Sequence, residues 1–336
     1  MTALRTPKKK AFAQVIIWVT LIIFLFQSTP IPAVGAVNTD ESSASTEQTQ
    51  ECRDKRIVAV LFSVGRNKDI LAHFDGVSNL DLFQVNGEPL IKHVYDTLRQ
   101  SKYIQNIVVV ATPEVEKKLD LEEDPNTSFV TDRGDAAKNV EFGIDAIQKG
   151  DLIMFIPSDL PLVTPEGLDT LIERVLQDKE VDVVFPLIKR EIYESKYPDK
   201  ERAYAHFREG QYTAAHVEFL RPDLFLEHTG EVSANKSSLY NVYYMRKNAL
   251  GMVRFLGVGL TLKYLFGALS PHDVEQYIYN RYKFRAKALF WDDPDLATDL
   301  SEPSDIPIID GVLQQRALAH SETPHVSFVS TVGGDT

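Results

Sequence analysis

An acidic residue at the end of an apolar run is the strongest candidate for chemistry in this chain. Asp159 follows the apolar run Leu152–Ile156 and precedes Thr164 and Pro165, which suit the first positions of a helix. A carboxylate at the end of a buried strand is well placed to hold a divalent cation against phosphate oxygens. The alternative is that Asp159 only stabilises the loop between strand and helix.

The elements around Asp159 follow an alternating pattern. Runs that are apolar throughout predict buried parallel strands at Ile57–Phe62, Ile107–Ala111, Leu152–Ile156 and Val181–Phe185. Amphipathic stretches predict helices at Pro89–Gln100, Ala136–Ile147 and Pro165–Leu176. Strand and helix in alternation indicate a doubly wound sheet, in which ligands bind at the carboxyl ends of strands. The loops after Phe62, Ile156 and Trp291 are therefore expected to carry the site.

The second half of the chain has looser patterns. Its predicted elements are a strand at Tyr212–Leu220, a helix at Tyr240–Asn248 and a late strand at Phe284–Trp291. Val253–Leu269 is apolar but contains Arg254, Lys263 and glycines, so we expect a docked helical segment and not a membrane span. The residues Ser270–Asp273 predict the capping box of a further helix, with proline at its first position.

The first 36 residues have the anatomy of an export signal. A cluster of lysines at 8–10 precedes the apolar run Ala11–Phe26, and small residues follow as far as Ala36. The run is shorter than the roughly 20 residues that span a bilayer, although extension toward Ile31 would lengthen it. Cleavage after Ala36 and retention as a membrane anchor both remain open. In either case the basic flank predicts that the folded domain lies outside the cytoplasm.

Composition divides the rest of the chain into three parts. Residues 37–52 are polar and without periodicity, which predicts a flexible linker. Residues 53–318 hold all the predicted strands and helices and form one folded α/β domain. Residues 319–336 turn to Ser, Thr, Gly and His without a pattern, which predicts a disordered tail.

Charge and cysteine content exclude several classes of function. The formal net charge of −12, with no stripe of Lys or Arg, argues against a nucleic-acid partner. Cys52 is the only cysteine, so no intramolecular disulfide and no cysteine-based zinc site can form. The chain contains no P-loop of the GxxxxGK[ST] form, no HExxH and no serine elbow, so kinase, zinc protease and α/β-hydrolase interpretations have no support. The sequence does not specify the oligomeric state.

A resemblance to a known family rests on the order of several motifs. Residues 158–171, SDLPLVTPEGLDTL, resemble the acid-strand motif of the MobA-like NTP transferases, the family of molybdenum-cofactor nucleotidyltransferases. The other matching segments are Asn86–Ile91, Ile107–Glu114, Asn139–Gly143, Tyr212–Asp223 and Asp295–Asp305. No single motif is specific, but together they fall in the order of the family between residues 53 and 310.

The resemblance implies a fold and a reaction. The fold is the Rossmann-like three-layer α/β/α sandwich of the nucleotide-diphospho-sugar transferase, or glycosyltransferase-A, type. The reaction is nucleotidyl transfer from an NTP to a small phosphorylated acceptor, with Mg²⁺ as the cofactor and pyrophosphate as the product. Carried across, Asp159 is the catalytic metal ligand and Asp299 the candidate second metal ligand. The alternative for Asp299 is a surface acid within a run of acids.

The resemblance is weakest in the loop after the first strand. The family has a glycine-rich loop ending in Arg, whose amides wrap the phosphates because glycine allows a close approach. Here the loop contains only Gly65, while Arg66 and Lys68 supply cations near the position of the family Arg. Gly87 and Asn139, in two of the matching segments, complete the expected nucleotide-binding residues.

Two further positions depart from the family. The family lysine that contacts phosphate falls at Leu80, so that contact is missing. His216 replaces a small or amide residue, and as a lone histidine it is interpreted as structural rather than catalytic.

Three functional hypotheses follow from the sequence. The first is an active nucleotidyltransferase, which the motif order favours and the export segment opposes, because nucleoside triphosphates are scarce outside the cytoplasm. The second is a glycosyltransferase-like enzyme that uses a nucleotide-activated sugar, although Asp159 lacks the second acid of an Asp-x-Asp strand end. The third is a non-catalytic descendant that binds a nucleotide or a protein.

Overall fold

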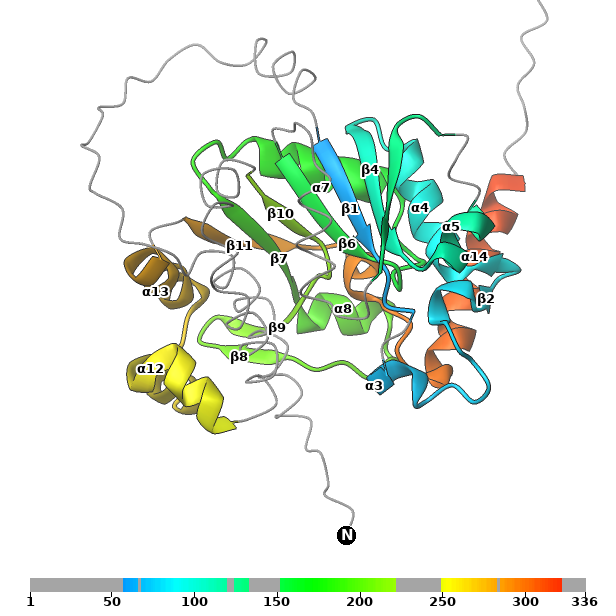
Figure 1. Cartoon of the computed structure of the whole chain (residues 1–336). Coiled ribbons are helices and arrows are strands. Elements are labelled where there is room, and N and C mark those ends of the chain that lie inside the picture. The colour runs from blue at the N-terminus through cyan, green and yellow to red at the C-terminus, as the bar shows by residue number, and fades with distance from the viewer. Residues whose placement is uncertain are drawn as a thin grey trace, which may run out of the picture.

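The computed structural model describes residues 57–65, 68–119, 124–132, 152–221, 249–282 and 285–321. The predicted export segment, the linker and the predicted helices Ala136–Ile147 and Tyr240–Asn248 lie outside these residues. The described part of the chain contains a nine-stranded sheet with the strand order β5-β4-β1-β6-β10-β7-β9-β8, and β11 pairs with β7. Figure 1 shows the sheet between two layers of helices.

The sheet has a parallel half and a mixed half. The parallel half consists of β1 (Ile57–Phe62), β4 (Ile104–Ala111), β5 (Thr127–Thr131) and β6 (Leu152–Pro157). The mixed half consists of β7 (Val183–Lys189), β8 (Ala205–Phe207), β9 (Gly210–Ala214), β10 (Glu218–Leu220) and β11 (Ala286–Trp291). The strand β10 runs antiparallel to both β6 and β7, whereas β11 runs parallel to β7.

Alternate residues of the central strands supply two separate cores, which is why these strands are apolar throughout. In β1, Ile57, Ala59 and Leu61 belong to one core, and Val58 and Val60 belong to the other. The first core is closed by α4 (Leu90–Gln100), α7 (Pro165–Leu176), α8 (Arg190–Lys196) and α14 (Ile306–Ser321). The second core receives side chains from α12 (Ala249–Leu265) and α13 (Pro271–Tyr282). The molecule therefore has three layers, as the resemblance implied.

Short elements join these layers and complete the described chain. A two-stranded sheet consists of β2 (Gln84–Val85) and β3 (Glu88–Pro89). The short helices are α3 (Lys68–Leu71), α5 (Pro113–Leu119) and the 3₁₀ turns η1 (Leu80–Leu82), η3 (Pro294–Ala297) and η4 (Pro303–Asp305).

Most predicted elements are present, and their bounds differ by a few residues. Both β1 and α7 have the predicted bounds, while β4 begins three residues earlier, at Ile104. The predicted strand Tyr212–Leu220 is two strands, β9 and β10, along one edge of β7. They are interrupted because His216 N donates to Leu296 O at 2.8 Å, away from β7.

The predicted docked segment is helical. The φ/ψ values of Gly257, 74° and 163°, break α12 into two pieces. Leu260 and Tyr264 of the second piece pack against the second core. Among the described helices, none is long and apolar enough to cross a membrane. The predicted capping box follows, because Ser270 N donates to Asp273 Oδ2 at 2.9 Å and Asp273 N donates to Ser270 Oγ at 3.0 Å.

Candidate active site

The candidate acid lies at the carboxyl edge of the parallel half-sheet. Asp159 is two residues beyond the end of β6, and β6 pairs with β1 in register. The helix that follows begins as predicted: Thr164 Oγ1 accepts a hydrogen bond from Gly167 N at 3.1 Å, and proline occupies the first turn. The strand and the capped helix therefore fix the short loop that carries Asp159.

Asp159 has a carboxyl group in an unfavourable environment. The residue is only 5% exposed, and its Oδ1 is buried without a hydrogen-bond partner. Burial, followed by the charges of Asp299 and Asp81, raises the pKa of the Asp159 carboxyl well above its usual range. In the absence of a cation this group is therefore held as the neutral acid over a wide range of pH.

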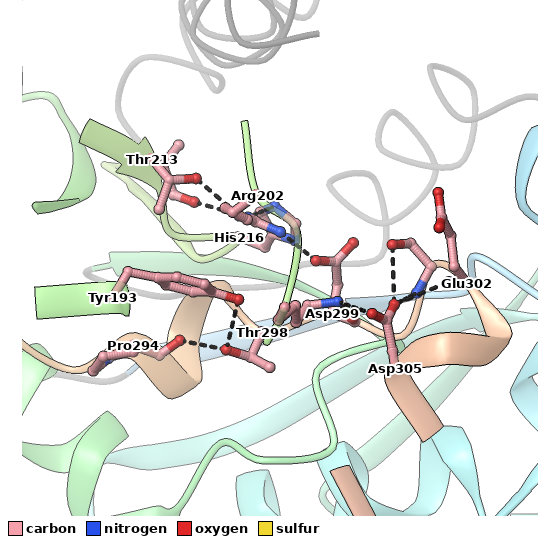
Figure 2. A network of polar contacts seen from close by, with 12 residues as sticks. Tyr193, Arg202, Thr213, His216, Pro294, Thr298, Asp299, Glu302 and Asp305 are labelled. Carbon is pink, nitrogen blue, oxygen red and sulfur yellow. Dashed lines mark hydrogen bonds and ion pairs between the residues drawn. The ribbon is translucent and has the colours of Figure 1, made fainter. Parts of the chain in front are cut away.

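Asp299 lies beside Asp159 and has the opposite electrostatic environment. Its carboxylate forms an ion pair with the Arg202 guanidinium, and Lys200 Nζ donates to its backbone oxygen at 2.8 Å (Figure 2). Burial alone would raise the pKa of Asp299. The charges of the buried Arg202 and Lys200 outweigh burial and lower it. The structure thus places the two predicted metal ligands together, one as an acid and one as a carboxylate.

A buried carboxyl oxygen without a partner, next to a second carboxyl group, suits a divalent cation completed by phosphate oxygens. The unpaired Oδ1 of Asp159 fits such an ion, because a cation would replace the proton and satisfy the buried oxygen. Within the described residues, no cluster of three or more His, Cys, Asp or Glu side chains could hold a metal by itself.

Asp81 is an acid that the sequence analysis missed. It is completely buried and accepts hydrogen bonds from Ser63 Oγ and, at 2.6 Å, from Ser158 Oγ. Ser158 precedes Asp159, and Val64 N donates to Ser158 Oγ at 3.0 Å. The Asp81 carboxyl therefore links the loop after β1 to the loop that carries Asp159.

The predicted close approach at Gly65 is made by the protein itself. A Cβ atom at Gly65 would lie 1.9 Å from Asn79 Oδ1 and 2.6 Å from the Asp81 carboxyl. Only glycine fits, and the groups it accommodates are the side chains of Asn79 and Asp81 of this same chain. Leu80, at the position of the family lysine, is fully buried in the first core, so that contact is absent here.

The remaining predicted nucleotide-binding residues have no described contact with this cluster, or they lie outside the described residues. Gly87 (φ 84°) and Asn86 (φ 48°) form the two-residue turn between β2 and β3, a conformation that favours glycine. Lys68 begins α3, and its side chain is not described. Arg66 and Asn139 lie outside the described residues.

His216 has the structural role expected of it. Its Nε2 lies 2.7 Å from Arg202 Nη2, so the neutral imidazole accepts from the guanidinium. Burial, and next the charge of Arg202, lowers the pKa of His216 to about 4. A neutral histidine can orient Arg202 without competing with Asp299 for its charge.

Arg202 and Lys200 are buried cations without a signal in the sequence. Their side chains are 4% and 2% exposed. Arg202 Nε also donates to Thr213 Oγ1 at 2.9 Å, and Lys200 Nζ pairs with Asp305 Oδ1 at 2.7 Å. Figure 2 shows Arg202 between Thr213 and His216 on one side and Asp299 on the other. The partners of Arg202 and Lys200 are distant in the sequence and become neighbours only when the chain folds, so these contacts could not be predicted from local sequence patterns.

Comparison with solved structures defines the class of fold. A hypothetical transferase from Thermus thermophilus has a TM-score of 0.60 and 24% identity, and the match covers 75% of this chain and 99% of that chain. The fold is therefore the predicted Rossmann-like α/β/α sandwich of the nucleotide-diphospho-sugar transferase type.

The chain also matches a family model. Residues 79–230 match the model of the MobA-like NTP transferase domain, so the resemblance predicted from the motifs is confirmed over that range. The range includes Asp81 and Asp159 and begins after Gly65, in agreement with the divergence of the loop.

Two further solved structures are more distant. A CMP:2-keto-3-deoxy-manno-octonic acid synthetase complexed with CTP is 13% identical with a TM-score of 0.48, and the match covers 78% of this chain and 100% of that chain. A 4-diphosphocytidyl-2C-methyl-D-erythritol synthase from Anaerococcus prevotii is 14% identical with a TM-score of 0.47, and the match covers 80% of this chain and 100% of that chain. No curated protein matches this chain.

Proposed function

We propose that this protein transfers a nucleotidyl group from an NTP to a phosphorylated acceptor and releases pyrophosphate, with Mg²⁺ held by Asp159 and Asp299. The observation that carries the proposal is the buried, unpaired Oδ1 of Asp159 beside the ion-paired carboxylate of Asp299. The match of residues 79–230 to the MobA-like domain supports this type of transfer.

Each residue of the site has a defined part in this proposal. An oxygen of the acceptor phosphate attacks the α-phosphorus of the NTP, and the bond from that phosphorus to the bridging oxygen of pyrophosphate breaks. A bound Mg²⁺ offsets the charge of the triphosphate. Asp159, as the ionised carboxylate, and Asp299 would hold this cation, and Arg202 keeps Asp299 ionised and oriented. Arg66 and Lys68 are proposed to bind phosphate, and Asn139 and Gly87 to contact the nucleotide.

The Asp81 carboxyl sets a limit on this activity. It adds a buried acid to the loop that binds phosphates in the family, and the family lysine is replaced by the buried Leu80. Negative charge near a polyphosphate weakens its binding. We therefore expect weaker nucleotide binding than a glycine-rich loop would give, and a stronger dependence on the cation.

Titration calorimetry on the full chain tests the proposal. CTP, GTP, UTP and UDP-sugars are titrated with and without Mg²⁺, and pyrophosphate release is followed with the NTP that binds. Asp159→Asn should abolish the Mg²⁺-dependent part of binding. Asp292→Asn is the matched control, because Asp292 is an exposed acid just beyond β11.

The outcomes separate the three functional classes. Mg²⁺-dependent NTP binding with pyrophosphate release, lost in Asp159→Asn and kept in Asp292→Asn, supports nucleotidyl transfer. If a UDP-sugar binds and none of the NTPs does, the result contradicts nucleotidyl transfer and favours glycosyl transfer. An absence of any nucleotide binding would leave a non-catalytic descendant of the fold and refute the proposal.

A further inference from the structure

One stretch of surface is apolar where a helix normally turns a polar face to water. The second piece of α12 and the turn after it expose Val258 (66%), Leu262 (46%), Leu265 (70%) and Phe266 (82%). Val258, Leu262 and Leu265 are four and three residues apart, so they share one side of the helix. We name these four residues the apolar face of α12.

Packing among the described residues does not account for the apolar face of α12. Leu260 and Tyr264, on the other side of the same turns, already pack against the second core. A helix that only covers a core has polar residues on its outer side. This one is apolar both toward the core and away from it, which is typical of a surface that meets a second apolar phase.

The apolar face is held in place by its surroundings. Lys263 Nζ pairs with Asp273 Oδ1 at 2.5 Å, and the capping box at Ser270 begins α13 directly after the turn. Arg208 N donates to Leu269 O at 2.7 Å and so ties the turn to the β8–β9 hairpin. The exposed side chains therefore lie on an anchored helical hairpin.

We propose that the apolar face of α12 rests on a lipid bilayer. The occupant is inferred from the chain that precedes the fold, since the apolar run Ala11–Phe26 with its basic flank is suited to enter a membrane. About 30 residues separate this run from β1, and a flexible segment of that length spans about 30 Å. A domain of this size has a radius of gyration of about 18 Å. An uncleaved apolar run would keep the domain near the bilayer, and the apolar face would then select the side that touches it.

The mode of contact follows from the charges. The net charge of −12 repels anionic headgroups, so burial of apolar side chains, and not electrostatic attraction, must provide the contact. Lys263, which is half exposed next to the face, already has its ammonium group paired with Asp273. We expect the contact to persist at high salt and on neutral phosphatidylcholine. It does not depend on the proposed transferase activity.

Lipid quenching of a single reporter tests the proposal. The full chain carrying Trp18→Phe and Trp291→Phe, which together remove both native tryptophans, is reconstituted into phosphatidylcholine vesicles that contain doxyl-labelled lipid. Phe266→Trp places the reporter on the apolar face. Leu318→Trp is the matched control, because Leu318 is 63% exposed on α14, at the opposite side of the molecule from α12 (Figure 1).

The expected result is quenching of Phe266→Trp several-fold stronger than that of Leu318→Trp. Adding Leu262→Glu and Leu265→Glu to the Phe266→Trp protein should remove the difference while the far-UV circular dichroism is unchanged. Equal quenching of the Phe266→Trp and Leu318→Trp proteins overturns the proposal. It is also overturned if the Phe266→Trp protein is bound to the vesicles, as shown by flotation, and its tryptophan is not quenched. Sedimentation experiments show whether the protein self-associates. If self-association shields the tryptophan at position 266 from the lipid quencher, the proposal is overturned, because a second copy of the chain then covers the apolar face.

Discussion

The backbone amide of Leu300 donates a hydrogen bond of 2.9 Å to the backbone oxygen of Asp159. This bond joins the loop after β6 to the segment after β11, which is distant in sequence. Asp299 precedes Leu300, so the same bond sets the position of its carboxylate relative to Asp159. The spacing of the two acids is therefore fixed by the main chain, and each acid can be replaced without removing the link.

Replacement of Asp159 by asparagine should stabilise the protein when no cation is present. The pKa of Asp159 is higher in the folded state than in the unfolded state, where it is 3.8. The contribution of Asp159 to the free energy of unfolding is therefore fully present below pH 3.8 and is lost as pH rises through the folded-state pKa. The asparagine amide has no such proton to lose. We expect Asp159→Asn to raise the free energy of unfolding at neutral pH by about 1 kcal/mol, measured in urea without Mg²⁺. A destabilised variant would mean that the carboxylate has a partner in the free protein.

Replacement of Asp299 should have the opposite sign. Its folded-state pKa is lowered, so its contribution to stability is present above 3.8 and is lost as pH falls through the folded-state value. Asp299→Asn leaves Arg202 buried without its carboxylate, which costs about 3–5 kcal/mol at neutral pH.

A double-mutant cycle with Arg202→Met measures the coupling of this pair. The urea midpoints of the two single variants and the double variant should show that the second substitution recovers part of the loss. Strict additivity of the two losses would rule out the ion pair as their origin.

Asp81→Asn tests the charge in the loop after β1. The amide keeps the size of the carboxyl group, and its oxygen can still accept from Ser158 Oγ. Burial raises the pKa of the Asp81 carboxyl, so the effect of removing its charge is expected at the upper end of the pH range, where binding of Mg²⁺-NTP should tighten by up to about tenfold. Calorimetry on this variant and on Asp292→Asn provides the comparison. An unchanged dissociation constant would place the Asp81 carboxyl out of electrostatic reach of the nucleotide.

Glu218 is a buried acid that the proposed reaction does not use. Both of its carboxyl oxygens are buried without a hydrogen-bond partner, and burial raises its pKa well above the usual range. Its stability contribution is greatest below 4.5 and is lost as pH rises. Glu218→Met should therefore raise the free energy of unfolding at neutral pH by about 1–3 kcal/mol, measured in urea across pH. Glu218→Gln keeps a buried polar group and should gain less. If both variants lose stability, the acid has a function in the folded protein.

The parallel half of the fold could be predicted from the sequence because its strands are buried on both faces and are therefore apolar at every position. The strand β1 is apolar at every position since it meets two cores, and α7 begins with a threonine and a proline that fix its first turn. The order of short strands and helices then leads to the layers and to Asp159.

The polar centre of the site could not be predicted in the same way. Arg202 binds Asp299 across nearly a hundred residues, and no local pattern records that contact. In the sequence Asp81 cannot be distinguished from other acids near turns. Its role depends on the hydrogen bonds from Ser63 and Ser158, which form only in the folded chain. Leu80 stands where the family has a lysine. This replacement was the only indication in the sequence that the neighbourhood of Asp81 differs from the family.

The place of β10 in the sheet has a consequence for synthesis of the chain. β6 and β7 are both complete before Glu218–Leu220 is made, yet they pair with each other only through that short antiparallel strand. A ribosome-bound chain therefore carries two apolar strands with unsatisfied amides until β10 inserts between them. Asp299 is translated later still, so the two acids can meet only after most of the domain has left the exit tunnel. The emerging polypeptide thus carries these unpaired strand edges before the two acids of the proposed site can come together.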